Sequence, residues 1–135
     1  MVTASTDSER IVLDFFAALS TGDLERVRPL FHEDAIWQVQ VQGIPGAGVH
    51  RGRKAIVDEF LAPVRGLFQP GEPKVEIDTM VSRGPLVALE TRGIGRMRNG
   101  KEYRNLYSFW LEVKDGKIYR LREYMDSHYV TTLVD

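Results

Sequence analysis

The sequence contains no cysteine, which excludes a disulfide framework, a thiolate nucleophile and a cysteine metal site. It also lacks an excess of charge of one sign. Its 18 basic and 19 acidic residues leave a formal charge of −1, which gives no electrostatic footprint for nucleic acid or an acidic membrane. No stretch approaches the roughly 20 apolar residues that span a bilayer, and the N-terminus lacks the apolar run of a signal peptide. We therefore expect a cytoplasmic protein that binds neither nucleic acid nor membrane.

The chain is too short for several domains and shows no repeat, linker or low-complexity segment. Its 135 residues, 43% hydrophobic and 27% charged, are enough to bury a core without staples. The sequence therefore predicts a single domain over residues 1–135.

Two turn signals organise the C-terminal half of the chain. Asn99-Gly100 and Asp115-Gly116 are typical of two-residue hairpins, because both central residues of a type I′ turn need a positive φ. They predict an antiparallel meander of strands 86–98, 101–114 and 117–129. Side chains alternate between the two faces of such strands, so the sequence also predicts which of them point to the core.

On strand 101–114 the core face carries Asn105, Tyr107, Phe109, Leu111 and Val113. A two-residue turn at Asn99-Gly100 then places Arg92 opposite Tyr107, with Glu90 and Ile94 on the same face.

The last strand has two possible registers. A strict two-residue turn would turn Arg120, Arg122 and Tyr124 to the core. One bulge or a three-residue turn would instead bury a different set, Tyr119, Leu121, Glu123 and Met125. Burying two arginines costs far more free energy than adding a bulge, so we expect the second register. Glu123 then stands among apolar side chains, with Arg92 two strands away.

The N-terminal half reads as two helices, a strand, a third helix and a strand. Thr6 and Glu9 fit a capping box before a helix over residues 7–20, and Asp23 caps a short helix that Pro29 limits. Further along the chain we expect a strand over 35–42, a glycine-rich loop over 43–52, an amphipathic helix over 53–68 with a kink at Pro63, and a strand over 74–82. This order predicts an α+β fold, in which three helices pack against the concave face of a curved antiparallel sheet and leave a pocket between the layers.

Four segments carry a resemblance to a known family: Gly22-Asp23-Leu24, residues 31–35 (FHEDA), residues 50–53 (HRGR) and residues 115–126 with DGKI and REYMD. With the order of elements, they make almost the whole chain similar to the nuclear-transport-factor-2-like superfamily, and within it to the SnoaL-like and ketosteroid-isomerase-related group. The resemblance implies the cone-shaped, cystatin-like fold. It also implies a small hydrophobic molecule as ligand and, since the group includes polyketide cyclases, steroid isomerases and epoxide hydrolases, chemistry without a cofactor.

The residues of limonene-epoxide-hydrolase-like enzymes match this chain in part. Glu123 stands where they place an aspartate that activates or orients water, and Arg92 matches their active-site arginine. Ile94 replaces their second carboxylate, while Trp37 and Val39 replace their tyrosine and asparagine on the first strand. The aspartate base of ketosteroid isomerases also falls near Val39.

We predict three catalytic residues: Glu123 as a general acid/base or water-positioning group, and Arg92 and Tyr107 as donors to an oxygen on which charge develops. The predicted ligand-binding residues are Trp37, Asn105, His50, Phe16, Phe60 and Phe109. An alternative interpretation is that Glu123 and Arg92 form a buried ion pair with a purely structural role. The three histidines show no metal-ligand spacing, so we predict neither a metal nor a cofactor.

Three functions remain open from the sequence. The first is a cofactor-free isomerase, cyclase or hydrolase, and the second is a non-catalytic module that binds the same kind of ligand, which the missing second carboxylate favours. The third is an interaction domain, whose interior would be filled by Trp37, Phe16, Phe60 and Phe109. Leu106 and Trp110, which lie on the outer sheet face beside Val87 and Leu89 in the predicted register, are expected to form a homodimer interface, because relatives often dimerise through that face.

Overall fold

The computed structural model describes residues 2–134, so the terminal residues of the predicted domain lie outside it. Its elements, in chain order, are α1 (Asp7–Ser20), α2 (Leu24–Val27), the 3₁₀ turn η1 (Arg28–Leu30), β1 (Phe31–Val39), β2 (Gly48–Arg51), the π-helical segment η2 (Ala55–Leu61), α3 (Ala62–Arg65), β3 (Lys74–Arg83), β4 (Leu86–Arg96), β5 (Glu102–Lys114), β6 (Lys117–Met125) and α4 (Ser127–Thr131).

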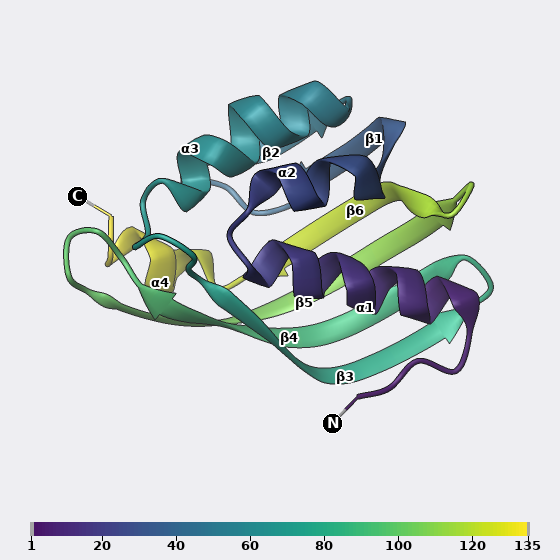
Figure 1. Ribbon diagram of the computed structural model, residues 1–135. Helices are drawn as coiled ribbons and strands as arrows, with labels where there is room; N and C mark the ends of the chain where they lie inside the picture. The colour runs from purple at the N-terminus through teal and green to yellow at the C-terminus, as the bar shows by residue number, and fades with distance from the viewer. Residues whose placement is uncertain (1, 135) are drawn as a thin grey trace.

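The strands form one curved sheet in the order β2-β1-β6-β5-β4-β3, and α1, α2 and α3 cover its concave face (Figure 1). The predicted α+β cone is thus confirmed. One pairing is parallel, that of β1 with β6, because the chain passes through β2 to β5 before β6 returns beside β1. The short strand β2 forms within the predicted loop 43–52.

The helices begin where the sequence predicts. The Thr6 hydroxyl accepts a hydrogen bond from the Glu9 N–H (3.1 Å), while the Glu9 carboxylate accepts from the Ser5 N–H (2.9 Å), so the capping box closes one residue earlier than expected. Asp23 caps α2 by accepting from the Glu25 N–H (3.0 Å). At the other end of the chain, the predicted strand 117–129 stops at Met125, because Asp126 caps the short helix α4.

The turn between β5 and β6 is the predicted two-residue turn, with positive φ at Asp115 (54°) and Gly116 (73°). The register then shifts by one residue within β6, so this strand has the predicted bulge. Because of this shift Leu121 and Glu123 are buried, and Glu123 lies opposite Phe109.

The predicted core position of Tyr119 is wrong, because Tyr119 is the extra residue of the bulge. Its neighbours Ile118 and Arg120 pair with consecutive residues of β5, and Tyr119 itself has no partner there. Ile118 enters the core instead, while the Tyr119 ring is half-buried against His32, with 5.0 Å between ring centroids.

The turn between β4 and β5 is one residue longer than predicted. The Met97 N–H donates to the Lys101 carbonyl (2.9 Å), and positive φ in this loop is confined to Gly100 (88°), so the loop holds three residues, 98–100. All of β4 therefore shifts by one residue, and Arg92 lies opposite Leu106 on the outer face.

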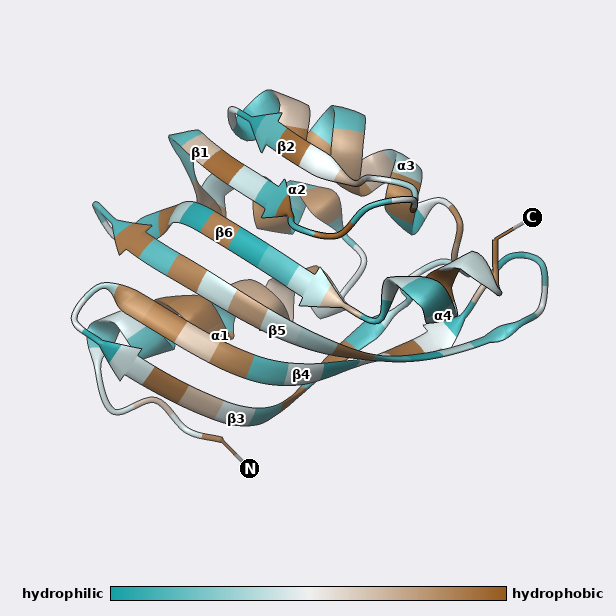
Figure 2. Ribbon diagram, turned by 180° about the vertical axis from the view of Figure 1, so that it is seen from behind, coloured by the Kyte–Doolittle hydropathy of each residue, from teal (hydrophilic) through white to brown (hydrophobic). Residues whose placement is uncertain are grey.

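One hydrophobic core fills most of the space between the helices and the sheet. Phe15 on α1 is fully buried, with the rings of Phe16, Phe31 and Trp37 at centroid distances of 5.1, 5.3 and 6.1 Å. The opposite face of the sheet carries no helix layer (Figure 2). Among the helices of residues 2–134, none has the length and apolar character needed to cross a membrane.

Candidate functional site

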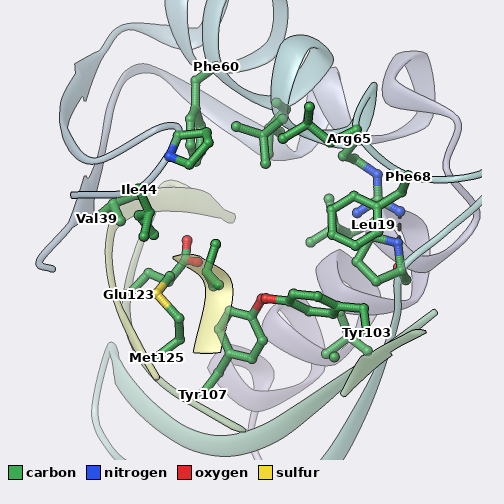
Figure 3. Close-up of a pocket in the computed structure, with 18 of the residues that line it drawn as sticks. Leu19, Val39, Ile44, Phe60, Arg65, Phe68, Tyr103, Tyr107, Glu123 and Met125 are labelled. Carbon is green, nitrogen blue, oxygen red and sulfur yellow. Dashed lines mark hydrogen bonds between the residues drawn. The ribbon is translucent and has the colours of Figure 1, made fainter. Parts of the chain in front are cut away.

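A cavity of about 110 Å³ lies between the concave face of the sheet and the η2–α3 helix (Figure 3). Its wall is largely apolar, with Phe60, Phe109 and Met125 among the lining residues. An engineered cavity of about 150 Å³ in another protein holds benzene, whereas a drug-sized ligand needs a pocket of roughly 300 Å³ or more. The cavity is smaller than both, so it has room for at most one small ring, and the interior is not completely filled.

Glu123 on β6 is the acidic residue of this cavity. Its side chain is buried, and its Oε1 accepts a hydrogen bond from the Trp37 Nε1 (2.7 Å). Loss of hydration raises the pKa of Glu123 to about 7, and the Trp37 hydrogen bond opposes this shift. Its second oxygen, Oε2, has no hydrogen-bond partner within residues 2–134. A carboxyl group with this pKa can both accept and donate a proton near neutral pH.

A chain of hydrogen bonds joins Asn105, Tyr103 and Tyr107. The Asn105 amide nitrogen donates to the Tyr103 hydroxyl (3.1 Å) and to the Asp126 carbonyl (3.2 Å), while its Oδ1 accepts from the Leu106 N–H (2.9 Å). The Tyr103 hydroxyl also makes a short hydrogen bond with the Tyr107 hydroxyl, in which either oxygen can be the donor. When Tyr103 is the donor, the Tyr107 proton is left for the cavity, which Tyr107 lines.

The two tyrosines stay protonated at neutral pH. Burial raises the pKa of Tyr103, and burial together with nearby negative charge raises the pKa of Tyr107 well above 10. Tyr107 can therefore donate a hydrogen bond to an oxygen in the cavity when Tyr103 donates to it, and its ring stacks on Phe109 with 5.4 Å between centroids.

Arg65 on α3 is the basic residue of the cavity lining. Its Nη2 donates to the Pro73 carbonyl (3.1 Å), and burial lowers its pKa. Thr91 on β4 also lines the cavity, and its buried hydroxyl has no hydrogen-bond partner within residues 2–134.

The comparisons with known proteins agree with this fold. Residues 12–121 match the SnoaL-like domain. The chain belongs to the SnoaL-like domain family. No curated protein sequence matches it.

Solved structures resemble this SnoaL-like domain over nearly its whole length. An NTF2-like protein from Burkholderia xenovorans LB400 is 25% identical, with a TM-score of 0.76 and coverage of 99% of this chain and 100% of that one. TerC, co-crystallized with polyporic acid, is 20% identical, with a TM-score of 0.81 and coverage of 95% and 98%. A Catenulispora acidiphila protein with a ketosteroid isomerase-like fold, in complex with trimethylamine, is 17% identical, with a TM-score of 0.72 and coverage of 84% and 83%. The resemblance inferred from the sequence is confirmed.

The SnoaL-like domain brings four of the predicted ligand-binding or catalytic side chains to the cavity beside Glu123: Trp37, Phe60, Tyr107 and Phe109. The other predicted ligand-binding residues do not line it. Asn105 lies behind Tyr103 and orients it. His50 lies behind Phe60, with its ring stacked at 4.0 Å and its Nε2 at 2.7 Å from the Gly46 carbonyl. Phe16 is buried in the core against Phe109.

The predicted core position of Arg92 is wrong. Its guanidinium lies on the outer face of the SnoaL-like domain, where it is 44% exposed and pairs with Asp78 (2.8 Å) and Glu76 (3.0 Å). The physical reason is the three-residue loop 98–100, which turns Thr91 rather than Arg92 toward Tyr107. Arg92 therefore neither pairs with Glu123 nor reaches a ligand in the cavity.

The sequence analysis missed Arg65 and Thr91, although a signal for each is present. Arg65 follows Leu61 by four residues and precedes Phe68 by three, so it shares the apolar helical face that the sequence predicts. Thr91 alternates with charged residues along β4, which places it on the inner face once the register is right. Within residues 2–134, no three His, Cys, Asp or Glu side chains cluster closely enough to hold a metal ion.

Proposed function

We propose that the cavity binds a small hydrophobic molecule with a carbonyl or hydroxyl oxygen, and that Glu123 moves a proton on this ligand without a cofactor. The observation that carries the proposal is the buried Glu123 carboxyl group, with a pKa of about 7, one hydrogen bond and a free second oxygen. Titratable groups with pKa values shifted toward neutrality are concentrated at functional sites.

The proposed reaction is an isomerisation by proton transfer. Glu123 takes a proton from the carbon next to a carbonyl group, and the Tyr107 hydroxyl donates a hydrogen bond to the carbonyl oxygen as negative charge develops there. Glu123 then returns the proton to another carbon of the resulting enolate, so that the product is an isomer of the substrate. Epoxide hydrolysis is less well supported, because Arg92 lies on the outer face.

Exchange of substrate protons with deuterated water tests this step. We expect the wild-type protein to catalyse exchange at the α-carbon of small cyclic ketones and enones, measured by proton NMR. The Glu123→Gln variant should lose about 10²-fold to 10⁴-fold of that rate, the usual contribution of a general base. Because glutamine can still accept the hydrogen bond from Trp37, ligand binding in a thermal-shift assay should persist.

The matched control is Glu90→Gln, which removes an exposed carboxylate on β4 and should leave the exchange rate unchanged. If the wild-type protein binds these ligands but catalyses no exchange, the protein is a non-catalytic binding module rather than an enzyme. The lack of a second carboxylate in the cavity lining favours this alternative. If no small ketone, enone, epoxide or phenol shifts the melting temperature, the ligand-binding proposal itself fails.

We also propose that two chains associate through the outer face of the sheet. Exposed apolar side chains gather there, with Leu106 68%, Trp110 38% and Tyr124 39% exposed. The sequence-based placement of Val87 and Leu89 on this face is wrong, because the β4 shift buries both in the core.

Light scattering after size exclusion tests the dimer. The wild type is expected to have twice the chain mass, and Trp110→Glu is expected to be a monomer, because a charge would be placed in the middle of the apolar contact. The control is Ala17→Glu, which adds the same charge at an exposed position on α1, on the other side of the sheet, and should remain a dimer. A monomeric wild-type protein at high micromolar concentration would contradict the proposal.

A further inference from the structure

Arg65 has a role in the cavity that the proposed proton transfer does not explain. A guanidinium carries five N–H donors, and the hydrogen bond of Arg65 to the Pro73 carbonyl engages one nitrogen, Nη2. Within residues 2–134, no carboxylate forms an ion pair with Arg65. Within residues 2–134, therefore, no negatively charged side chain contacts Arg65 directly and balances its charge.

The other ionisable groups that line the cavity do not supply that balance. Glu123 is uncharged below about pH 7, and the buried tyrosines Tyr103 and Tyr107 stay protonated well above neutral pH. Arginine remains protonated in proteins even where burial lowers its pKa. Below about pH 7 the cavity thus carries a net positive charge, and a partly buried cation costs free energy unless an anion pairs with it.

The position of Arg65 shows which part of a ligand would meet it. Arg65 and Glu123 lie at opposite sides of the cavity, with the tyrosine pair along the wall between them (Figure 3). The positive charge of Arg65 acts to lower the pKa of Tyr107, so the two side chains lie close enough to interact electrostatically. Thr91, whose hydroxyl lacks a partner, adds a second polar group to the same lining.

We propose that the ligand of this cavity is a small carboxylic acid with a single ring, whose carboxylate pairs with Arg65 while its ring lies toward Glu123. This assignment rests on the proposed function, because it names the substrate class of the same site. Arg65 determines specificity, since it selects an anionic group at one end of the ligand and leaves the proton transfer to Glu123. Planar, bidentate pairing makes arginine well suited to a carboxylate.

Benzoate and nitrobenzene form a test pair, because they have nearly the same shape and differ in charge. We expect NMR titrations at pH 6.5, where Glu123 is mostly protonated, to show benzoate binding about tenfold or more tightly than nitrobenzene, as hydrogen bonds to a charged group imply. Arg65→Met should abolish this preference by weakening benzoate and leaving nitrobenzene unchanged. Arg65→Lys, which keeps the charge, should retain part of it. The control Arg26→Met removes an exposed arginine from α2 and should change neither affinity.

The outcomes separate this assignment from the function on which it rests. Equal binding of the two probes to the wild type, or binding of small ketones but not of benzoate, overturns the carboxylate assignment and leaves proton transfer by Glu123 intact. A benzoate preference that survives in Arg65→Met overturns the role of Arg65. If neither probe nor any ketone binds, the proposed function and the assignment fail together. If Arg65→Met does not fold, the Arg65→Lys variant provides the test. A benzoate preference that is fully lost despite the retained charge, or that does not change at all, would contradict paired hydrogen bonding between Arg65 and the ligand carboxylate.

Discussion

Replacing Glu123 with glutamine is expected to raise the free energy of unfolding by about 3 kcal/mol at pH 8 and to leave it nearly unchanged at pH 4. Burial raises the pKa of Glu123 from its ordinary value of 4.5 to about 7 in the folded protein. Below pH 4.5 the group is protonated in both states, so its burial carries no charge penalty. Between 4.5 and 7 the unfolded chain alone releases the proton, so stability falls as the pH rises. Above 7 the full penalty remains, and glutamine avoids it.

Urea denaturation of both proteins at pH 4, 6 and 8 measures this difference. The readout is the gap between wild type and variant, because other groups of the chain titrate equally in both. Glu90→Gln, on the exposed outer face, is the control and should show no such gap. A gap between wild type and Glu123→Gln that stays constant from pH 4 to pH 8 would mean that the Glu123 carboxyl group titrates normally. The same variant is expected to lose proton exchange, so greater stability and lower activity would arise from one buried charge.

Truncating Phe15 to alanine is expected to lower the free energy of unfolding by about 4 kcal/mol, the usual loss for a phenylalanine in a well-packed core. Phe15 is fully buried and contacts Phe16, Phe31 and Trp37, so its removal leaves a cavity among three rings that cannot all move inward. Because Trp37 also holds Glu123, the loss should weaken ligand binding as well. Urea denaturation and thermal shift with a bound ligand measure the two effects.

Phe15→Leu is the matched control, since it keeps most of the side-chain volume and should cost less than about 1.5 kcal/mol. Equal losses for the alanine and leucine variants would show that the aromatic ring contacts, rather than the volume of the side chain, stabilise this part of the core.

The register of each strand decided how much of the site could be predicted from the sequence. For β6 the correct argument was the cost of burying two arginines, and it placed Glu123 in the interior. The same argument applies to β4, where the predicted register buries Glu90 and Arg92 and exposes Leu89. Instead, the prediction followed the turn signal at Asn99-Gly100, which permits either a two-residue or a three-residue loop. The burial pattern of a long strand is the stronger physical constraint, because it involves many side chains.

The positions of Asn105 and His50 could not be predicted from alternation alone. Asn105 does point inward, but its amide is hydrogen-bonded to the Tyr103 hydroxyl, which in turn contacts the Tyr107 hydroxyl. His50 lies on β2, a four-residue strand whose existence depends on pairing with β1 rather than on any local signal. Contacts that involve several distant segments give no periodic pattern in the sequence.

The chain of hydrogen bonds that ends at Tyr107 has a consequence for how this cavity can evolve. At its origin, two main-chain groups, the Asp126 carbonyl and the Leu106 N–H, hold the Asn105 amide in one orientation. Substitutions other than proline at position 106 keep these main-chain groups, so descendants that keep Asn105 and the two tyrosines inherit a tyrosine donor at the same wall. Exchanging the carboxylic acid across the cavity could then give new reactions while the donor stays constant.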